Sequence, residues 1–183
     1  MPTLSQSLNV HDLGLLHIIA DLWGGELQAP DVRQGRENLH KLLLDPQLIL
    51  EITESLSNQA QSGLAELIHH NGKIPWAQFV RRYGEVREFG LAKRDRKKPY
   101  FNPSSTSEIL WYRALLGRAF YDTPEGPQEF AFIPIDFIPL MPNFSAEESS
   151  SLSRPAAPAE RAHIIPASDN ILDDACTLLA GLR

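Results

Sequence analysis

The segment NGKIP, residues 71–75, restricts the fold of this chain more than any other. Apolar residues recur at helical spacing over about 59–70, and the Asn-Gly pair that follows favours the left-handed backbone that ends a helix. Helical spacing resumes at Trp76 and stops at Gly84, so a short extended link joins the two helices. The sequence therefore predicts helix, short strand and helix in this part of the chain.

A third helix and a hairpin are predicted after this unit. Ser105 and Glu108 make a capping box, which predicts a helix from about residue 106 to about residue 120. Residues 120–134 hold two extended runs around a Pro-Glu-Gly turn, the pattern of a β-hairpin. The complete order is that of a winged helix-turn-helix, whose third helix can lie in a DNA major groove beside the hairpin. We expect this domain to span residues 58–142.

Three more helices are predicted before this domain, over about 10–23, about 32–44 and from Pro46 to about 56. Asn9 is expected to cap the first of them. Asp45 precedes Pro46 as an N-cap, because proline is well tolerated at the first helical position. We therefore predict a mainly α fold, with an N-terminal helical segment (1–57) followed by a winged helix-turn-helix that ends in a β-hairpin.

The end of the chain has a different composition. Residues 143–168 are rich in Ser, Ala, Glu and Pro, and they predict a linker. Helical spacing returns between Asn170 and Leu182. We interpret residues 169–183 as the start of a further domain of a longer protein. A helix that docks back on the body is the alternative.

Positive charge is concentrated in one stretch of an otherwise acidic chain. The net charge is −6, yet eight of the 17 Lys and Arg residues lie within 81–98. Phosphate contact needs charge more than precise geometry, so the stretch favours a DNA partner; a solvated loop that pairs with acidic groups is the alternative. The residues expected to contact the DNA backbone are Arg81, Arg82, Lys93, Arg94, Arg96, Lys97, Lys98 and Arg118.

The outward face of the predicted third helix carries small and apolar side chains. Helices that read bases usually present Arg, Asn, Gln or Lys to the groove, so we expect backbone-led binding with weak sequence selectivity. The alternative function is a protein–protein or interdomain interaction module that does not bind DNA. Its predicted interface is this same face, made of Leu110, Trp111, Ala114 and Gly117.

Two aromatic residues, Tyr100 and Phe101, lie next to the basic stretch. Such side chains either stack on the exposed bases of a single strand or pin a long loop to the body of the protein. We favour pinning, because it is the commoner role of aromatic residues in a proline-flanked loop.

No motif for catalysis or metal binding occurs in the sequence. The GxxxxGK[ST], GxGxxG, HExxH and GxSxG patterns are absent, and the six histidines lack metal-ligand spacing. We therefore predict a non-enzymatic protein without cofactor, metal or small-molecule substrate. The single cysteine fits a reducing compartment, and neither a secretory signal nor a membrane-spanning run is recognisable, so a cytoplasmic location without a membrane partner is expected.

Residues 72–134 carry a resemblance to a known family, in "GKIPWAQFVRRYGEVREFG" and "NPSSTSEILWYRALLGRAFYDTPEGPQEFAFIP". This part resembles the accessory N-terminal regions that some bacteria place on or beside XPB-type DNA repair helicases. The resemblance implies a winged-helix module within a larger nucleic-acid-associated protein. Besides DNA, the partner expected from the sequence is the C-terminal remainder of a longer chain or another protein. The Walker lysine loop and the DEAH-like box of a helicase motor do not occur, so no catalytic residue is carried over.

Overall fold

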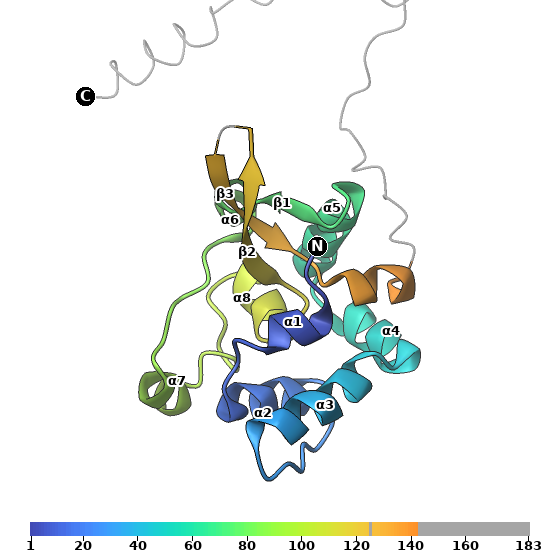
Figure 1. Cartoon of the computed structure of the whole chain (residues 1–183), viewed down its shortest axis with the longest axis vertical. Coiled ribbons are helices and arrows are strands. Elements are labelled where there is room, and N and C mark those ends of the chain that lie inside the picture. Colours follow the sequence, from blue (N-terminus) through green and yellow to red (C-terminus); the bar gives the residue numbers. More distant parts are fainter. Residues whose placement is uncertain (125, 143–183) are drawn as a thin grey trace, which may run out of the picture. The chain divides into compact units, whose positions relative to one another are not determined.

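The computed structural model of the chain describes residues 1–124 and 126–142, and the predicted linker and C-terminal helix lie outside this part. The described part is rich in helix, as predicted, and Figure 1 shows its elements. The helices are α1 (Leu4–Leu8), α2 (Leu13–Leu22), α3 (Val32–Leu43), α4 (Pro46–Ser55), α5 (Asn58–His69), α6 (Trp76–Tyr83), α7 (Leu91–Lys97), α8 (Thr106–Trp111) and the 3-10 helix η1 (Ile135–Leu140). None of the helices in this part is long and apolar enough to span a bilayer.

Three antiparallel strands form one small sheet: β1 (Lys73–Pro75), β2 (Gly117–Thr123) and β3 (Gly126–Phe132). Their order is β1-β3-β2, with Ile74 opposite Ala131. The strand between α5 and α6 therefore joins the sheet through the last strand of the hairpin, although the two are far apart in the sequence. This pairing brings the two halves of residues 58–142 together.

Local signals placed four of the helices correctly. The α3, α4, α5 and α6 helices begin and end within two residues of their predicted bounds. Asp45 caps α4 by accepting a hydrogen bond from the Gln47 amide, with Pro46 at the first helical position. Asn71 and Gly72 have φ angles of 55° and 81°, the left-handed backbone expected at the end of α5. These signals act within one or two turns, which is why the sequence alone reveals them.

The start of the chain differs from the prediction. A short helix, α1, precedes the first predicted one, and it begins at a capping box made by Thr3 and Gln6. Asn9 lies at the C-terminal end of α1 and does not cap α2. The cap of α2 is Asp12, whose carboxylate accepts a hydrogen bond from the Leu15 amide. The predicted cap was wrong because Asn9 and Asp12 are both of the N-cap type and lie within four positions of each other, so the sequence alone does not show which of them caps the helix.

The predicted third helix is much shorter than expected. Ser105 caps α8, but the helix ends at Trp111 instead of about residue 120. Ala114 adopts a left-handed φ of 56°, and the chain is extended again from Gly117 onward as β2. The apolar residues Ala114, Leu115 and Leu116 fit a buried turn as well as a helix, since all three are inside the protein. The hairpin accordingly begins at residue 117 and not at 120.

Residues 85–104, expected as a loop between the second and third helices of the winged helix, contain the additional helix α7. Figure 1 shows α7 apart from α6, at a different side of the described part of the chain. The helix has no apolar stripe that would signal it in the sequence. A contact with a distant segment, described below, holds it in place.

One hydrophobic core spans both predicted segments. It includes Leu16 and Leu39 from the N-terminal helices together with Leu64, Leu110 and Phe137 from the later part. Trp23 stacks on Phe137 at 6.1 Å between ring centroids and donates its indole N–H to the backbone oxygen of Arg113. The boundary expected at residue 57 therefore does not separate two cores, and residues 1–142 belong to one compact unit.

A glycine test checks the hairpin register. A Cβ atom at Gly117 would overlap the ring of Phe132, which lies opposite it in the sheet. The Gly117→Ala variant should lose about 1 to 3 kcal/mol of unfolding free energy in urea, as other overpacked sites do. Gly90→Ala is the matched control, because nothing lies within 4 Å of its added Cβ atom, and it should change stability by less than about 0.5 kcal/mol. Equal stabilities for the two variants would contradict this packing.

Candidate nucleic-acid interface

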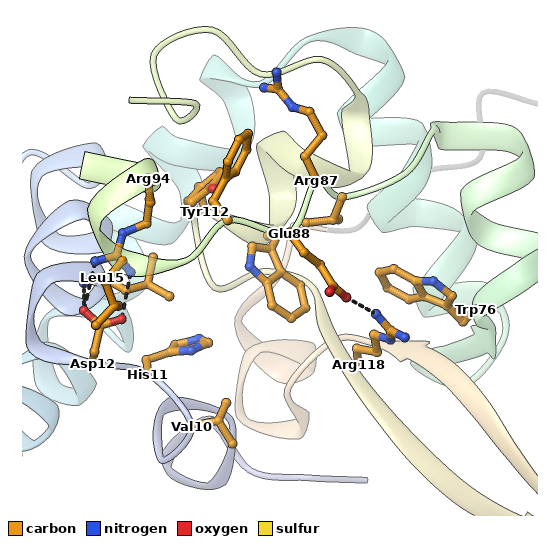
Figure 2. Close-up of a pocket in the computed structure, with 14 residues that line it drawn as sticks. Val10, His11, Asp12, Leu15, Trp76, Arg87, Glu88, Arg94, Tyr112 and Arg118 are labelled. Atoms are coloured by element: carbon orange, nitrogen blue, oxygen red, sulfur yellow. Dashed lines mark hydrogen bonds and ion pairs between the residues drawn. The ribbon is translucent and has the colours of Figure 1, made fainter. Parts of the chain in front are cut away.

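The α7 helix is fixed to the N-terminal helices by an ion pair. The guanidinium of Arg94 donates to both carboxylate oxygens of Asp12, at 2.7 and 2.9 Å, as the dashed lines of Figure 2 show. Only 5% of Arg94 is exposed, and its Nη2 atom lies over Gly14, where a side chain would collide with it. Arg94 is therefore an internal anchor. Its predicted role as a DNA contact was wrong, because its donors are used inside the protein.

The ion pair and the surrounding burial change the ionisation of two neighbouring groups. The hydrogen bonds from Arg94 lower the pKa of Asp12 to about 2, although partial burial opposes them. Burial lowers the pKa of His11 to about 4, against the attraction of Asp12. At neutral pH, Asp12 is therefore charged and His11 is neutral.

A second ion pair holds the chain just before α7. The Glu108 side chain is fully buried and accepts hydrogen bonds from the backbone and guanidinium N–H groups of Arg87 and from Ser104. Burial raises the pKa of Glu108, but these hydrogen bonds outweigh it, and the pKa lies below its ordinary value. The residues on both sides of α7 are thus attached to α8.

The outward side of α7 carries the exposed positive charges. Lys93, Arg96 and Lys97 fall within an arc of about 100° on this helix, and Lys98 follows at its end. All four are exposed, and no carboxylate among residues 1–124 and 126–142 forms a salt bridge with them. We call these four residues the basic face. They are the part of the predicted DNA-contact set that the structure brings together.

The other predicted contacts lie elsewhere. Arg81 and Arg82 are exposed on α6, and Arg82 pairs with Glu66 on α5 at 2.7 Å. Arg118 lies on β2, where it pairs with Glu88 and Glu129 and lies 5.0 Å from the Trp76 ring centroid. The eight predicted residues therefore do not form one surface.

The predicted protein interface is enclosed. No residue from Thr106 through Gly117 is exposed, and Leu110 is completely buried. Ala114 is also buried, and Gly117 faces the ring of Phe132 in the sheet. Since the helix ends at Trp111, these residues do not share a helical face. The prediction of an exposed apolar interface on this helix was wrong for that reason.

Two pockets lie next to each other, the first between α7 and the hairpin and the second between α1 and the hairpin. The first has a volume of about 330 Å³ and the second about 510 Å³. Figure 2 shows the first, with Asp12 and Arg94 at one end and Trp76 and Arg118 at the other. Their common lining residues are Val10, His11, Trp111 and Arg118.

Several residues that line the pockets were not predicted as site residues from the sequence. Trp76 begins an apolar helical pattern, which does not distinguish a buried ring from a half-buried one. Asp12 had a readable signal, because it precedes an apolar helical run as an N-cap residue does. His11 and Glu88 had no signal in the sequence that would identify them as site residues. Within the described ranges, no three His, Cys, Asp or Glu side chains are grouped closely enough to hold a metal ion.

The two aromatic residues beside the basic face differ in position. Tyr100 packs against Tyr112, with 6.0 Å between ring centroids, as expected of a residue that pins the loop. Phe101 is 66% exposed, and the Lys98 ammonium lies 6.0 Å from its ring centroid. One ring therefore holds the segment and the other is available to solvent.

The Asp12–Arg94 pair predicts a specific pH dependence. Because the folded-state pKa of Asp12 is depressed, its contribution to stability is present above pH 4 and is lost as the pH falls towards 2. With 36% of the Asp12 side chain exposed, we expect about 1 kcal/mol. Asp12→Asn keeps the helix cap and removes the charge. Urea unfolding should show the variant less stable at pH 6 and equal to the natural protein near pH 2; a constant difference would contradict the pairing.

Comparisons with known proteins do not assign this interface. No protein-family model, curated protein or solved structure matches the chain. The resemblance of residues 72–134 to accessory regions of XPB-type helicases stays a prediction from the sequence. The proposed function therefore rests on the basic face.

Proposed function

We propose that this protein is a non-enzymatic winged-helix module that contacts the DNA backbone through α7. The observation that carries the proposal is the basic face of Lys93, Arg96, Lys97 and Lys98. It stands on a helix that an internal ion pair holds in place, and it lacks acidic partners in the described part of the chain. Exposed cations without partners are suited to phosphate groups.

The order of elements supports the winged-helix assignment for residues 58–142. Helix α5, strand β1, helices α6 and α8 and the β2–β3 hairpin follow one another as such a domain requires, with α7 inserted between its second and third helices. The pairing of β1 with β3 supports it further, because the first strand then closes on the hairpin. On this assignment, α8 is the helix that would ordinarily enter a major groove.

The contact is assigned to α7 because α8 is covered. A helix that reads bases needs exposed donors and acceptors, and α8 has no exposed residue. The residues before and after α7 are hydrogen-bonded to Glu108 of α8. The inserted segment would therefore have to move away from α8 before α8 entered a DNA groove. The basic face requires no such rearrangement.

The position of α7 also favours contact with phosphates over bases. Lys and Arg on the outside of a short helix offer charge to a backbone without a fixed pattern of donors for one base pair. Four phosphate contacts would give a log–log salt slope of about −4 on duplex DNA. An acidic protein would also be attracted to this face. The salt dependence of DNA binding separates the two partners, because a face suited to an acidic protein would bind DNA only weakly.

Charge reversal on α7 tests the proposal. Fluorescence anisotropy with labelled duplex DNA should show binding that weakens steeply with salt, with a slope of about −4. In the Lys93→Glu/Lys97→Glu variant, the slope should become shallower, changing from about −4 to about −2. The affinity at low salt should fall at least tenfold. The matched control is Arg33→Glu/Lys41→Glu, which makes the same charge change at exposed positions on α3 and should retain most of the binding.

Two results would contradict the proposal. Equal losses in both double variants would show that only net charge matters. The absence of binding at low salt by the natural protein, with circular dichroism showing it folded, would exclude DNA contact through the basic face.

A further inference from the structure

The pocket next to α7 adjoins the basic face at one residue, Lys93. Leu91 and Arg94 of α7 form part of its wall, and the Lys93 ammonium lies 5.5 Å from the ring centroid of Phe89, another wall residue. The volume of about 330 Å³ lies in the range of sites for small ligands. A molecule whose charged part rests on α7 could therefore place a neighbouring group in this pocket.

Part of the wall of the pocket is aromatic. It includes the rings of Trp76, Phe89, Trp111 and Tyr112. Trp76 and Trp111 are only partly buried, unlike Trp23 in the core, which is 2% exposed. Indoles that face a cavity offer a large flat surface with little conformational entropy to lose, so they suit a planar ring.

The polar groups of the pocket suit a ring that carries hydrogen-bonding edges. His11 is neutral at pH 7 because burial lowers its pKa to about 4, so it adds no charge to the wall. The Glu88 side chain is 85% exposed and is joined to Arg118 by a single contact of 3.2 Å (Figure 2). Because this ion pair is weak, Glu88 can release Arg118 and form hydrogen bonds with a ligand instead.

We infer that this pocket takes an unstacked nucleobase of a single strand whose phosphates lie on the basic face. The inference rests on the proposed function and deepens it, because it adds a preference for single strands. A nucleotide joins an anionic phosphate to a planar aromatic base, and Lys93 of the basic face lies at the wall of the pocket in a similar arrangement. In a duplex the bases are stacked and paired, so their faces are not available to the indole rings.

The experiment compares three probes of similar charge: an oligothymidylate of about ten nucleotides, an abasic oligomer of equal length and a short duplex. Anisotropy gives their affinities at one salt concentration. We expect the natural protein to bind the oligothymidylate about tenfold more tightly than the abasic oligomer. Trp76→Leu and Trp111→Leu should each remove most of this preference and leave abasic binding unchanged, whereas Trp76→Phe and Trp111→Phe should restore part of it.

Phe101→Ala is the matched control, because Phe101 is an exposed aromatic residue beside the same cations but outside the pocket. It should keep the preference for the oligothymidylate. If Phe101→Ala removes the preference and the tryptophan variants keep it, the base stacks on the exposed ring and the pocket assignment is overturned.

Indole fluorescence provides a second readout that does not depend on folded variants. Trp23 is buried and hydrogen-bonded, so base stacking should quench Trp76 and Trp111 only. Saturable quenching by the oligothymidylate, and none by the abasic oligomer, would support the inference. Equal affinities for these two probes without quenching would overturn the inference and leave the proposed backbone contact standing. Failure of all three probes to bind would instead remove the proposed function, and the inference with it.

Discussion

The ion pair between Arg94 and Asp12 joins segments that are 82 residues apart, and the proposed functional surface depends on it. It fixes α7 to the start of α2, so the outward cations have a defined position. The same pair closes one end of the aromatic pocket. Removal of either partner alone would leave a charged group without its counterion, and in the case of Arg94 that group is buried. The pair is therefore more important for the placement of α7 than its net contribution to stability indicates.

The segment around α7 changes which part of the domain can meet a partner. Arg87 and Ser104 bond to Glu108, and Tyr100 packs on Tyr112, so the inserted segment is attached to the third helix before and after α7. This attachment covers α8 and creates a surface beside it. Under the proposed winged-helix assignment, the inserted helix α7 would be presented to DNA, with the first pocket next to it.

Sequence reasoning succeeded where the signal is local and failed where it is not. The α3 to α6 helices were predicted within two residues, since spacing, caps and left-handed residues act over one or two turns. The length of α8 was overestimated, because the apolar residues up to Ala119 fit a helix as well as a buried turn and an edge strand. The α7 helix was missed, because its position depends on Asp12, far away in the sequence. The predicted linker and final helix lie outside the described residues.

For the candidate site, the sequence by itself determined that positive charge gathers between residues 81 and 98 and that an aromatic pair stands beside it. Only the tertiary structure decided the role of each member. Lys93 and Arg94 are adjacent and similar in sequence, yet one is exposed and the other is buried against Asp12. Tyr100 and Phe101 differ in the same way, because Tyr100 packs on Tyr112 and Phe101 is exposed. The physical reason is that burial and ion pairing depend on which distant residues fold against each side chain, and no local pattern records those contacts.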